Sequence, residues 1–252
     1  MNRISIFADF SLTTFLKILI SLILTSILLL PLTCNQPQKR KILIVTGGHD
    51  FEREPFFEIF KAIPEIEFTE AVQPQANALY ASEEILQYDA LVFYDMVQEI
   101  TDAQKQAFLE LLQRGKGIVF LHHSLASYQE WDEFKEIIGG RYHLKPAEGF
   151  GASNYQHDVE VPVQIVDQKN PITKGLTDFV IHDEIYGNFE VVPQVVPLLK
   201  TSHPQSTEII GWAHRYRNSR VVYVQLGHDH YAYENPNYRQ LLKQAIEWVR
   251  RE

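Results

Sequence analysis

The chain has a single cysteine, Cys34, among its 252 residues, so the folded part cannot contain an internal disulfide and has to be stabilised by its hydrophobic core. It also has no excess of basic residues, because 23 lysines and arginines stand against 32 aspartates and glutamates, a net charge of −9. A nucleic-acid partner is therefore not expected, since that role needs a basic face. No repeat, low-complexity tract or linker follows Pro37, which leaves room for one large domain.

The longest apolar run lies near the N-terminus, where residues 18–33 carry no charge and follow Arg3 and Lys17. The run is shorter than the about 20 residues of a relaxed membrane span and is typical of a signal peptide. Because Cys34 follows it directly, the segment resembles a bacterial lipoprotein signal, in which this cysteine is lipidated; a non-lipidated signal or an uncleaved anchor is the alternative. We expect a signal peptide over residues 1–34, a linker over 35–40 and a domain over 41–252. The domain is expected outside the cytoplasm, lipid-anchored at a bacterial membrane and facing the periplasm or the exterior.

Strand and helix patterns alternate in the first half of this domain, which is typical of a parallel sheet with helices on both faces. The second half is richer in strands and ends in an amphipathic helix. The fold class is therefore α/β, mainly parallel, with additional antiparallel strands in the second half. Strands are predicted at residues 41–47, 66–72, 90–95, 118–122, 158–166, 179–192, 195–201, 208–212 and 220–226, and helices at 54–63, 102–113 and 236–250.

Three of the predicted strands end in histidine. His49 follows the first, His122 and His123 end the fourth, and His228 and His230 follow the last. The carboxyl ends of parallel strands share one edge of a sheet, so these residues are expected to meet in one crevice. If the fourth strand continues through both of its histidines, their side chains point to opposite sides and only one faces the crevice.

Histidines combined with a carboxylate are typical ligands of zinc and similar divalent metals. We predict His49, His123 and His228 as metal ligands, and His123 with Asp183 or Glu184 as the catalytic groups that carry protons or orient a water. No His-x-x-x-His pair is present, so the site has to be assembled from distant segments. Acid–base chemistry by the same groups without a metal is one alternative, and a non-catalytic carbohydrate-binding protein is another.

Aromatic residues are frequent in the predicted loops near the crevice. Flat apolar faces with polar rims suit sugar rings, whose C–H faces stack while their hydroxyls form hydrogen bonds. A small carbohydrate is therefore the expected partner; no nucleotide cofactor is expected, and the oligomeric state is not indicated. The predicted substrate-binding residues are Tyr186, Trp212, His230, Tyr231 and Tyr233.

Five short motifs occur in the order seen in the ThuA-like (trehalose utilisation) family. The sequence resembles that family over nearly all of residues 41–250. The resemblance implies a flavodoxin-like fold related to class I glutamine amidotransferases, and a role in the catabolism of glycosides or oxidised (keto) sugars, as a hydrolase, lyase or isomerase. The motifs are Thr-Gly-Gly-His-Asp at 46–50, Gly-Ile-Val-Phe-Leu-His at 117–122, Asn-Pro-Ile-Thr-Lys-Gly-Leu at 170–176, Asp-Glu-Ile-Tyr at 183–186, and the final strand at 220–228.

The relationship to amidotransferases does not extend to their chemistry. Those enzymes attack glutamine with a cysteine at a tight turn after a strand, because a thiolate is the nucleophile. The equivalent turn at residues 121–125 has no cysteine, and neither has the rest of the predicted domain. Glutamine hydrolysis by that mechanism is excluded. Ser124 lies in the turn but lacks the Gly-x-Ser-x-Gly spacing of a serine nucleophile.

Overall fold

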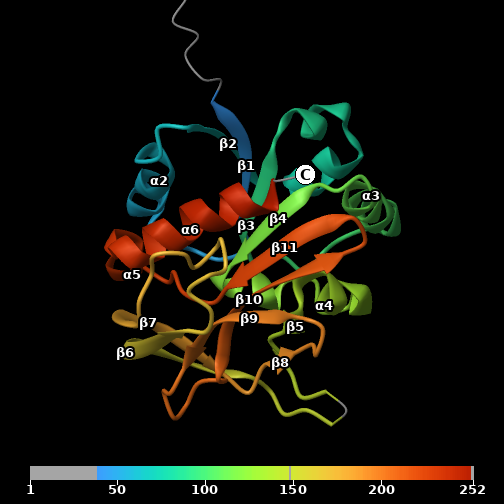
Figure 1. The fold of residues 1–252 in the computed structure, drawn as a ribbon. Coiled ribbons are helices and arrows are strands. Elements are labelled where there is room, and N and C mark those ends of the chain that lie inside the picture. The colour runs from blue at the N-terminus through green and yellow to red at the C-terminus, as the bar shows by residue number, and fades with distance from the viewer. Residues whose placement is uncertain (1–38, 148, 251–252) are drawn as a thin grey trace, which may run out of the picture. The chain divides into compact units, whose positions relative to one another are not determined.

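The computed structural model describes residues 39–147 and 149–250 (Figure 1). Cys34 and the predicted signal peptide lie outside the described residues. Among the helices that are described, none is long and apolar enough to cross a membrane.

Five parallel strands form the centre of the fold. Their order in the sheet is β2 (Ile66–Val72), β1 (Arg40–Gly47), β3 (Ala90–Asp95), β4 (Gly117–Leu121) and β11 (Ser219–Val224). This order is that of a flavodoxin-like sheet, as the family resemblance implied. The inner strands are continuous apolar runs because both faces of the sheet are covered.

Helices cover both faces of the sheet, as the alternation of strands and helices predicted. On one face lie α2 (Arg53–Lys61), α5 (His230–Glu234) and α6 (Pro236–Val249), and α6 crosses the strands in Figure 1. The other face carries α3 (Asp102–Gln113), α4 (Asp132–Ile138) and the 3₁₀ helix η1 (Gln75–Ala81). Two further 3₁₀ helices are η2 (Glu83–Gln87) and η3 (His122–Ala126). The sequence analysis predicted α2, α3 and α6, but not α4, α5 or the 3₁₀ helices.

The second half extends the sheet with antiparallel strands, as predicted. After β11 come β10 (Ile209–Tyr216), β9 (Val196–Thr201), β6 (Asn154–Ile165) and β7 (Phe179–Gly187). The short strands β5 (Gly140–Arg141) and β8 (Glu190–Val191) pair separately. β7 is last in the order, yet its residues contact α5 and the segment after β11. The antiparallel part therefore bends back over the carboxyl edge of the parallel strands.

A β-bulge interrupts the pairing of β6 with β7. The register shifts by one residue, so that His157 and Asp158 together oppose Glu184. Asp158 has a φ of 55°, in the left-handed region. Bulges bend a strand and re-aim its side chains, and this one places His157 beside Glu184.

The backbone turns sharply after β4. The strand ends at Leu121, and His122 has a φ of 49°, so the alternation of an extended strand does not continue through His123. The sequence analysis allowed only one of these histidines to face the crevice, on the condition that the strand continued. Because it does not, both side chains reach the same region.

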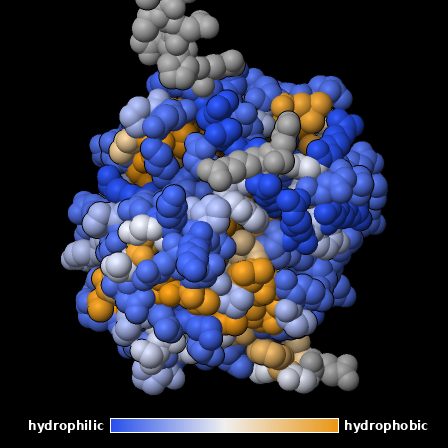
Figure 2. Space-filling view, viewed as in Figure 1, coloured by the Kyte–Doolittle hydropathy of each residue, from blue (hydrophilic) through white to orange (hydrophobic). Residues whose placement is uncertain are grey.

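The face of the molecule in Figure 2 is mainly hydrophilic, with apolar groups between the charged and polar ones. Large apolar side chains that are exposed include Leu144, Tyr155 and Tyr231. Single exposed apolar residues are normal on protein surfaces, so they need an explanation only where they border a cavity.

Candidate metal centre and substrate cavity

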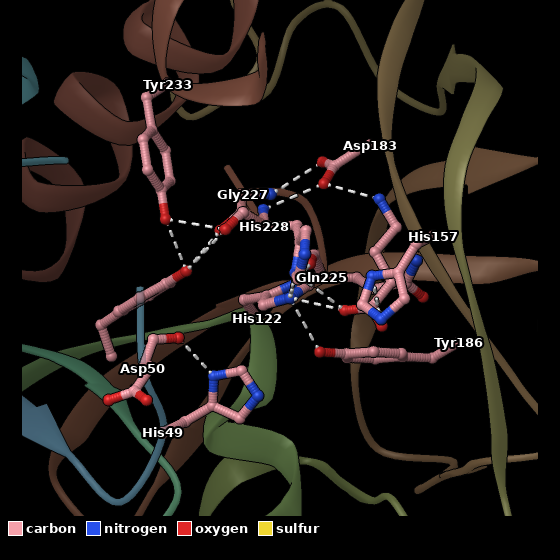
Figure 3. Close-up of polar contacts among 12 residues, drawn as sticks. His49, Asp50, His122, His157, Asp183, Tyr186, Gln225, Gly227, His228 and Tyr233 are labelled. Atoms are coloured by element: carbon pink, nitrogen blue, oxygen red, sulfur yellow. Dashed lines mark hydrogen bonds and ion pairs between the residues drawn. The ribbon is translucent and has the colours of Figure 1, made fainter. Parts of the chain in front are cut away.

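Three side chains from separate elements meet at the carboxyl edge of the sheet. They are His122 after β4, Glu184 on β7 and His228 after β11. Figure 3 labels the two histidines of this group. His122 Nε2 lies 2.9 Å from Glu184 Oε2, and His228 Nδ1 lies 3.2 Å from the same oxygen. The two nitrogens are 3.3 Å apart. The three potential ligand atoms therefore form a small triangle.

The size of this triangle fits a divalent metal. Zinc binds histidine nitrogen and carboxylate oxygen at about 2.0–2.2 Å, which puts neighbouring ligand atoms of a tetrahedral site roughly 3.3 Å apart. The three separations are 2.9, 3.2 and 3.3 Å. Two histidines and one carboxylate also form a ligand set that leaves a coordination position for water or substrate.

The ring of His122 is oriented by a backbone carbonyl. Its Nδ1 lies 2.6 Å from the carbonyl oxygen of Gln225, and because a carbonyl only accepts, Nδ1 carries the proton and donates it. The other nitrogen, Nε2, faces Glu184 and His228. When it is protonated it donates to the carboxylate, and when it is deprotonated it presents the lone pair that a metal would bind. Metal-bound histidines are commonly fixed in this way by a carbonyl on the other nitrogen. The Tyr186 hydroxyl, 2.9 Å from Nε2, contacts the same side of the ring.

The buried carboxylate of Asp183 holds two of the three residues in place. It accepts the backbone N–H groups of Glu184 at 2.8 Å, His228 at 2.9 Å and Gly227 at 2.8 Å (Figure 3). Burial raises the pKa of Asp183, while His122 and these N–H groups oppose part of the rise. Asp183 therefore contacts backbone rather than the open part of the site.

Glu184 and His228 each favour the charged form of the other. Burial disfavours ionisation of Glu184, but hydrogen bonds from His122 and His228 outweigh it and hold the pKa of Glu184 well below its ordinary value. The hydrogen bond to Glu184 raises the pKa of His228. The carboxylate is thus ionised at neutral pH. Because it is buried, a cation beside it would stabilise its charge.

A cavity of about 250 Å³ adjoins Glu184. His157 lies at this cavity, with its Nδ1 3.4 Å from Glu184 Oε1 and its ring 4.5 Å from that of His228. His49 stacks on His123 with ring centroids 4.7 Å apart. Burial, together with His122 and His49, holds the pKa of His123 well below its ordinary value, so this imidazole is neutral. The lining residues are His49, Met96, His123, Ala126, Tyr142, Leu144, Tyr155, His157, Glu184 and Tyr186.

A family model described as ThuA, trehalose utilisation, matches residues 41–249. The chain belongs to the ThuA family. Among solved structures, a ThuA-like protein from Parabacteroides merdae is similar, with a TM-score of 0.73 and 18% identity over 84% of this chain and 90% of that one. A ThuA-like protein from Bacteroides uniformis has a TM-score of 0.67 and 22% identity, over 87% and 94%. At these identities the similarity to solved structures shows the fold alone.

Part of a larger enzyme also shares this fold. A β-galactosidase from Rahnella sp. R3 has a TM-score of 0.56 and 10% identity, over 83% of this chain but only 32% of that one. The shared part is about a third of that enzyme, so its activity carries no argument here. No curated protein sequence matches this ThuA-family chain.

The ThuA-family site differs in composition from the ligand set predicted from sequence. His228 belongs to the triangle, but His122 and Glu184 join it in place of His49 and His123. His49 and His123 line the cavity instead. Sequence reasoning assigned Glu184 a catalytic role and chose His123 rather than His122 as the ligand from the end of β4. The left-handed backbone at His122 has no clear signature in the sequence.

Among the predicted substrate contacts, only Tyr186 lines the cavity. Trp212 is fully buried, and its indole N–H donates to the Ile138 carbonyl at 2.8 Å. Tyr233 is also fully buried and bonds the Tyr94 hydroxyl at 2.7 Å. Both pack inside the fold and do not reach the cavity.

His230 and Tyr231 lie at the surface beside the site. His230 Nδ1 is 2.8 Å from a carboxylate oxygen of Glu52, and Tyr231 packs against His182. Neither lines the cavity. His157, which was not among the predicted site residues, does line it because of the bulge in β6.

Asp95, at the end of β3, holds the turn that carries His122 and His123. Its carboxylate accepts the Ser124 hydroxyl at 3.2 Å and the Gln73 amide at 3.3 Å, and all three side chains are buried. Burial raises the pKa of Asp95 to about 7, although these hydrogen bonds oppose part of the rise. Asp95 is therefore protonated in the folded protein at pH values where the unfolded chain has ionised it.

This raised pKa predicts a pH-dependent loss of stability that Asp95→Asn removes. A group whose pKa is higher in the folded than in the unfolded protein contributes its full stabilisation at pH values below its unfolded pKa. This contribution to the free energy of unfolding is lost as the pH rises to the folded pKa. The free energy of unfolding of Asp95→Asn minus that of the parent protein should therefore increase by roughly 2 kcal/mol from pH 5 to pH 8. Urea titrations at both pH values measure this. The surface variant Asp102→Asn is the control, and the same pH response in both variants would refute the assignment.

Proposed function

We propose that this ThuA-family protein is a carbohydrate-active enzyme that binds a divalent metal through His122, Glu184 and His228. The observation that carries the proposal is the triangle of ligand atoms, whose sides of 2.9–3.3 Å fit the spacing around one ion. The orientation of His122 by the Gln225 carbonyl supports it, because Nε2 is left free to bind.

The substrate would occupy the cavity beside Glu184. Its lining combines tyrosine rings with imidazoles, which suits the apolar faces and hydroxyls of a sugar. The family description, trehalose utilisation, favours a glycoside or a derived keto-sugar. A metal at the triangle would supply a Lewis acid that polarises a carbonyl group or a water. Hydrolysis, elimination and isomerisation all use such a site.

Two histidines are placed to handle protons for this chemistry. His123 is buried and neutral at the cavity wall, so it can accept a proton. The side chain of His157 is 45% exposed and lies beside Glu184, so solvent reaches its ring. A base has to lie within hydrogen-bonding reach of the reacting group, and both side chains line the cavity that would hold it.

A metal-free enzyme is the second candidate. His122 Nε2 lies 2.9 Å from Glu184 Oε2, a distance that also suits a hydrogen bond from a protonated imidazole to a carboxylate. In that case the pair would act as the acid and base itself. Metal analysis separates the two candidates.

The purified protein should bind close to one zinc or manganese ion per chain, measured by inductively coupled plasma mass spectrometry after incubation with the metal and desalting. His122→Ala and His228→Ala should each reduce retained metal at least tenfold, because each removes one of three ligands. The controls are His182→Ala and His230→Ala, which remove histidines that form surface ion pairs outside the triangle.

A parent protein that retains no metal would refute the metal-dependent proposal. The metal-free enzyme would then be supported only if a keto-glycoside is turned over and His122→Ala abolishes the turnover. Sugar binding without turnover would instead identify a carbohydrate-binding protein. Metal loss in the control variants would show that histidine number, rather than the triangle, determines binding.

We also propose that the protein is an exported lipoprotein, because Cys34 directly follows an uncharged apolar segment. Cys34→Ser should move the protein from the membrane fraction to the soluble fraction of a bacterial host, because stable anchoring needs the lipid. Immunoblots of the two fractions measure this. An unchanged membrane association in the variant would favour an uncleaved anchor.

A further inference from the structure

Tyr155 is exposed although it lines the cavity. Its relative exposure is 60%, whereas Tyr142 and Tyr186, which line the same cavity, are 8% and 6% exposed. The edge contact with His157, at 5.0 Å between ring centroids, leaves much of the ring open to solvent. A flat, exposed aromatic face at the border of a pocket is a typical surface for stacking a sugar ring.

The backbone that carries this ring is part of a paired strand. Tyr155 pairs with Tyr186 across β6 and β7, and its neighbours Asn154 and Gln156 are also paired. The bulge begins only after Gln156. Tyr155 is therefore part of a strand rather than of a loose loop, and binding to it would cost little backbone entropy.

The dimensions of the cavity indicate that a ligand extends beyond it. About 250 Å³ lies below the roughly 300–1,000 Å³ of typical small-molecule sites, so the enclosed part suits a single sugar ring. Leu144, 45% exposed, adds a second apolar side chain to the border. A second sugar ring attached to the first would lie at this border, outside the cavity. Its apolar face would then need an apolar side chain to pack against.

The charge of the lining favours an uncharged ligand. None of the described residues that line the cavity is lysine or arginine, and one of them is the acidic residue Glu184. A phosphate or carboxylate group on the ligand would find no cationic side chain among them. A neutral glycoside fits this environment better than a sugar phosphate or a uronic acid.

We propose that Tyr155 forms an outer sugar-binding subsite, and that the ligand is a neutral glycoside of at least two rings. One ring lies in the cavity beside Glu184, and the second stacks on Tyr155. The proposal rests on the carbohydrate-active function proposed above and adds the size and charge of the ligand. The stacking on Tyr155 does not depend on whether a metal is bound, because Tyr155 does not belong to the triangle. The preference for an uncharged ligand applies to the protein without metal.

Isothermal titration calorimetry with trehalose, maltose, cellobiose and glucose tests the subsite. At least one disaccharide should bind the parent protein more tightly than glucose, by roughly 3- to 10-fold, the range expected for one ring-stacking contact. Tyr155→Ala should weaken disaccharide binding more than glucose binding and so remove this difference, while Tyr155→Phe should keep it. Glucose 6-phosphate and glucuronate should bind more weakly than glucose.

Tyr231→Ala is the matched control, because Tyr231 is 54% exposed and does not line the cavity. The proposal would be overturned if no disaccharide bound more tightly than glucose, or if no sugar bound at all. It would also be overturned if Tyr155→Ala lowered the affinities for glucose and the disaccharide equally. The metal content of the same preparations is measured in parallel. Failure of the subsite with retained metal is thereby distinguished from failure of the metal-dependent function.

Discussion

The carboxylate of Asp183 is the contact on which the site depends. It accepts three backbone N–H groups, on Glu184 of its own strand and on Gly227 and His228 after β11. These hydrogen bonds join β7, the last strand of the sheet, to the end of a central parallel strand. They fix the backbones of Glu184 and His228 relative to each other. Buried N–H groups left without an acceptor are also costly, so the arrangement is strongly specified.

The charge distribution around Glu184 explains why a cation is the natural occupant of the triangle. An ionised carboxylate is costly to bury unless hydrogen bonds or positive charge compensate it. Two imidazoles supply part of this compensation, and one of them, His122, has its Nδ1 proton directed away to Gln225. A metal would neutralise the carboxylate and use the free nitrogen of His122 at once. Of the three residues of the triangle, Glu184 also borders the cavity.

Much of the fold could be predicted from sequence, because the apolar runs of parallel strands and the helix caps are local signals. The strand at residues 90–95 and the helix begun by the Thr101 capping box occur where predicted. The meeting of histidines at one sheet edge also follows from strand direction. The identity of the triangle does not, because it depends on the left-handed backbone of His122 and on the return of β7 over the edge. Aromatic composition likewise could not separate the buried Trp212 and Tyr233 from the exposed Tyr155.

The most direct test of the central claim is a crystal structure of the zinc-loaded protein, with anomalous diffraction recorded at the zinc absorption edge. The account predicts one anomalous peak about 2.0–2.2 Å from His122 Nε2, His228 Nδ1 and a Glu184 oxygen. A peak between His49 and His123, a peak at the surface histidines, or no peak at the triangle would contradict it.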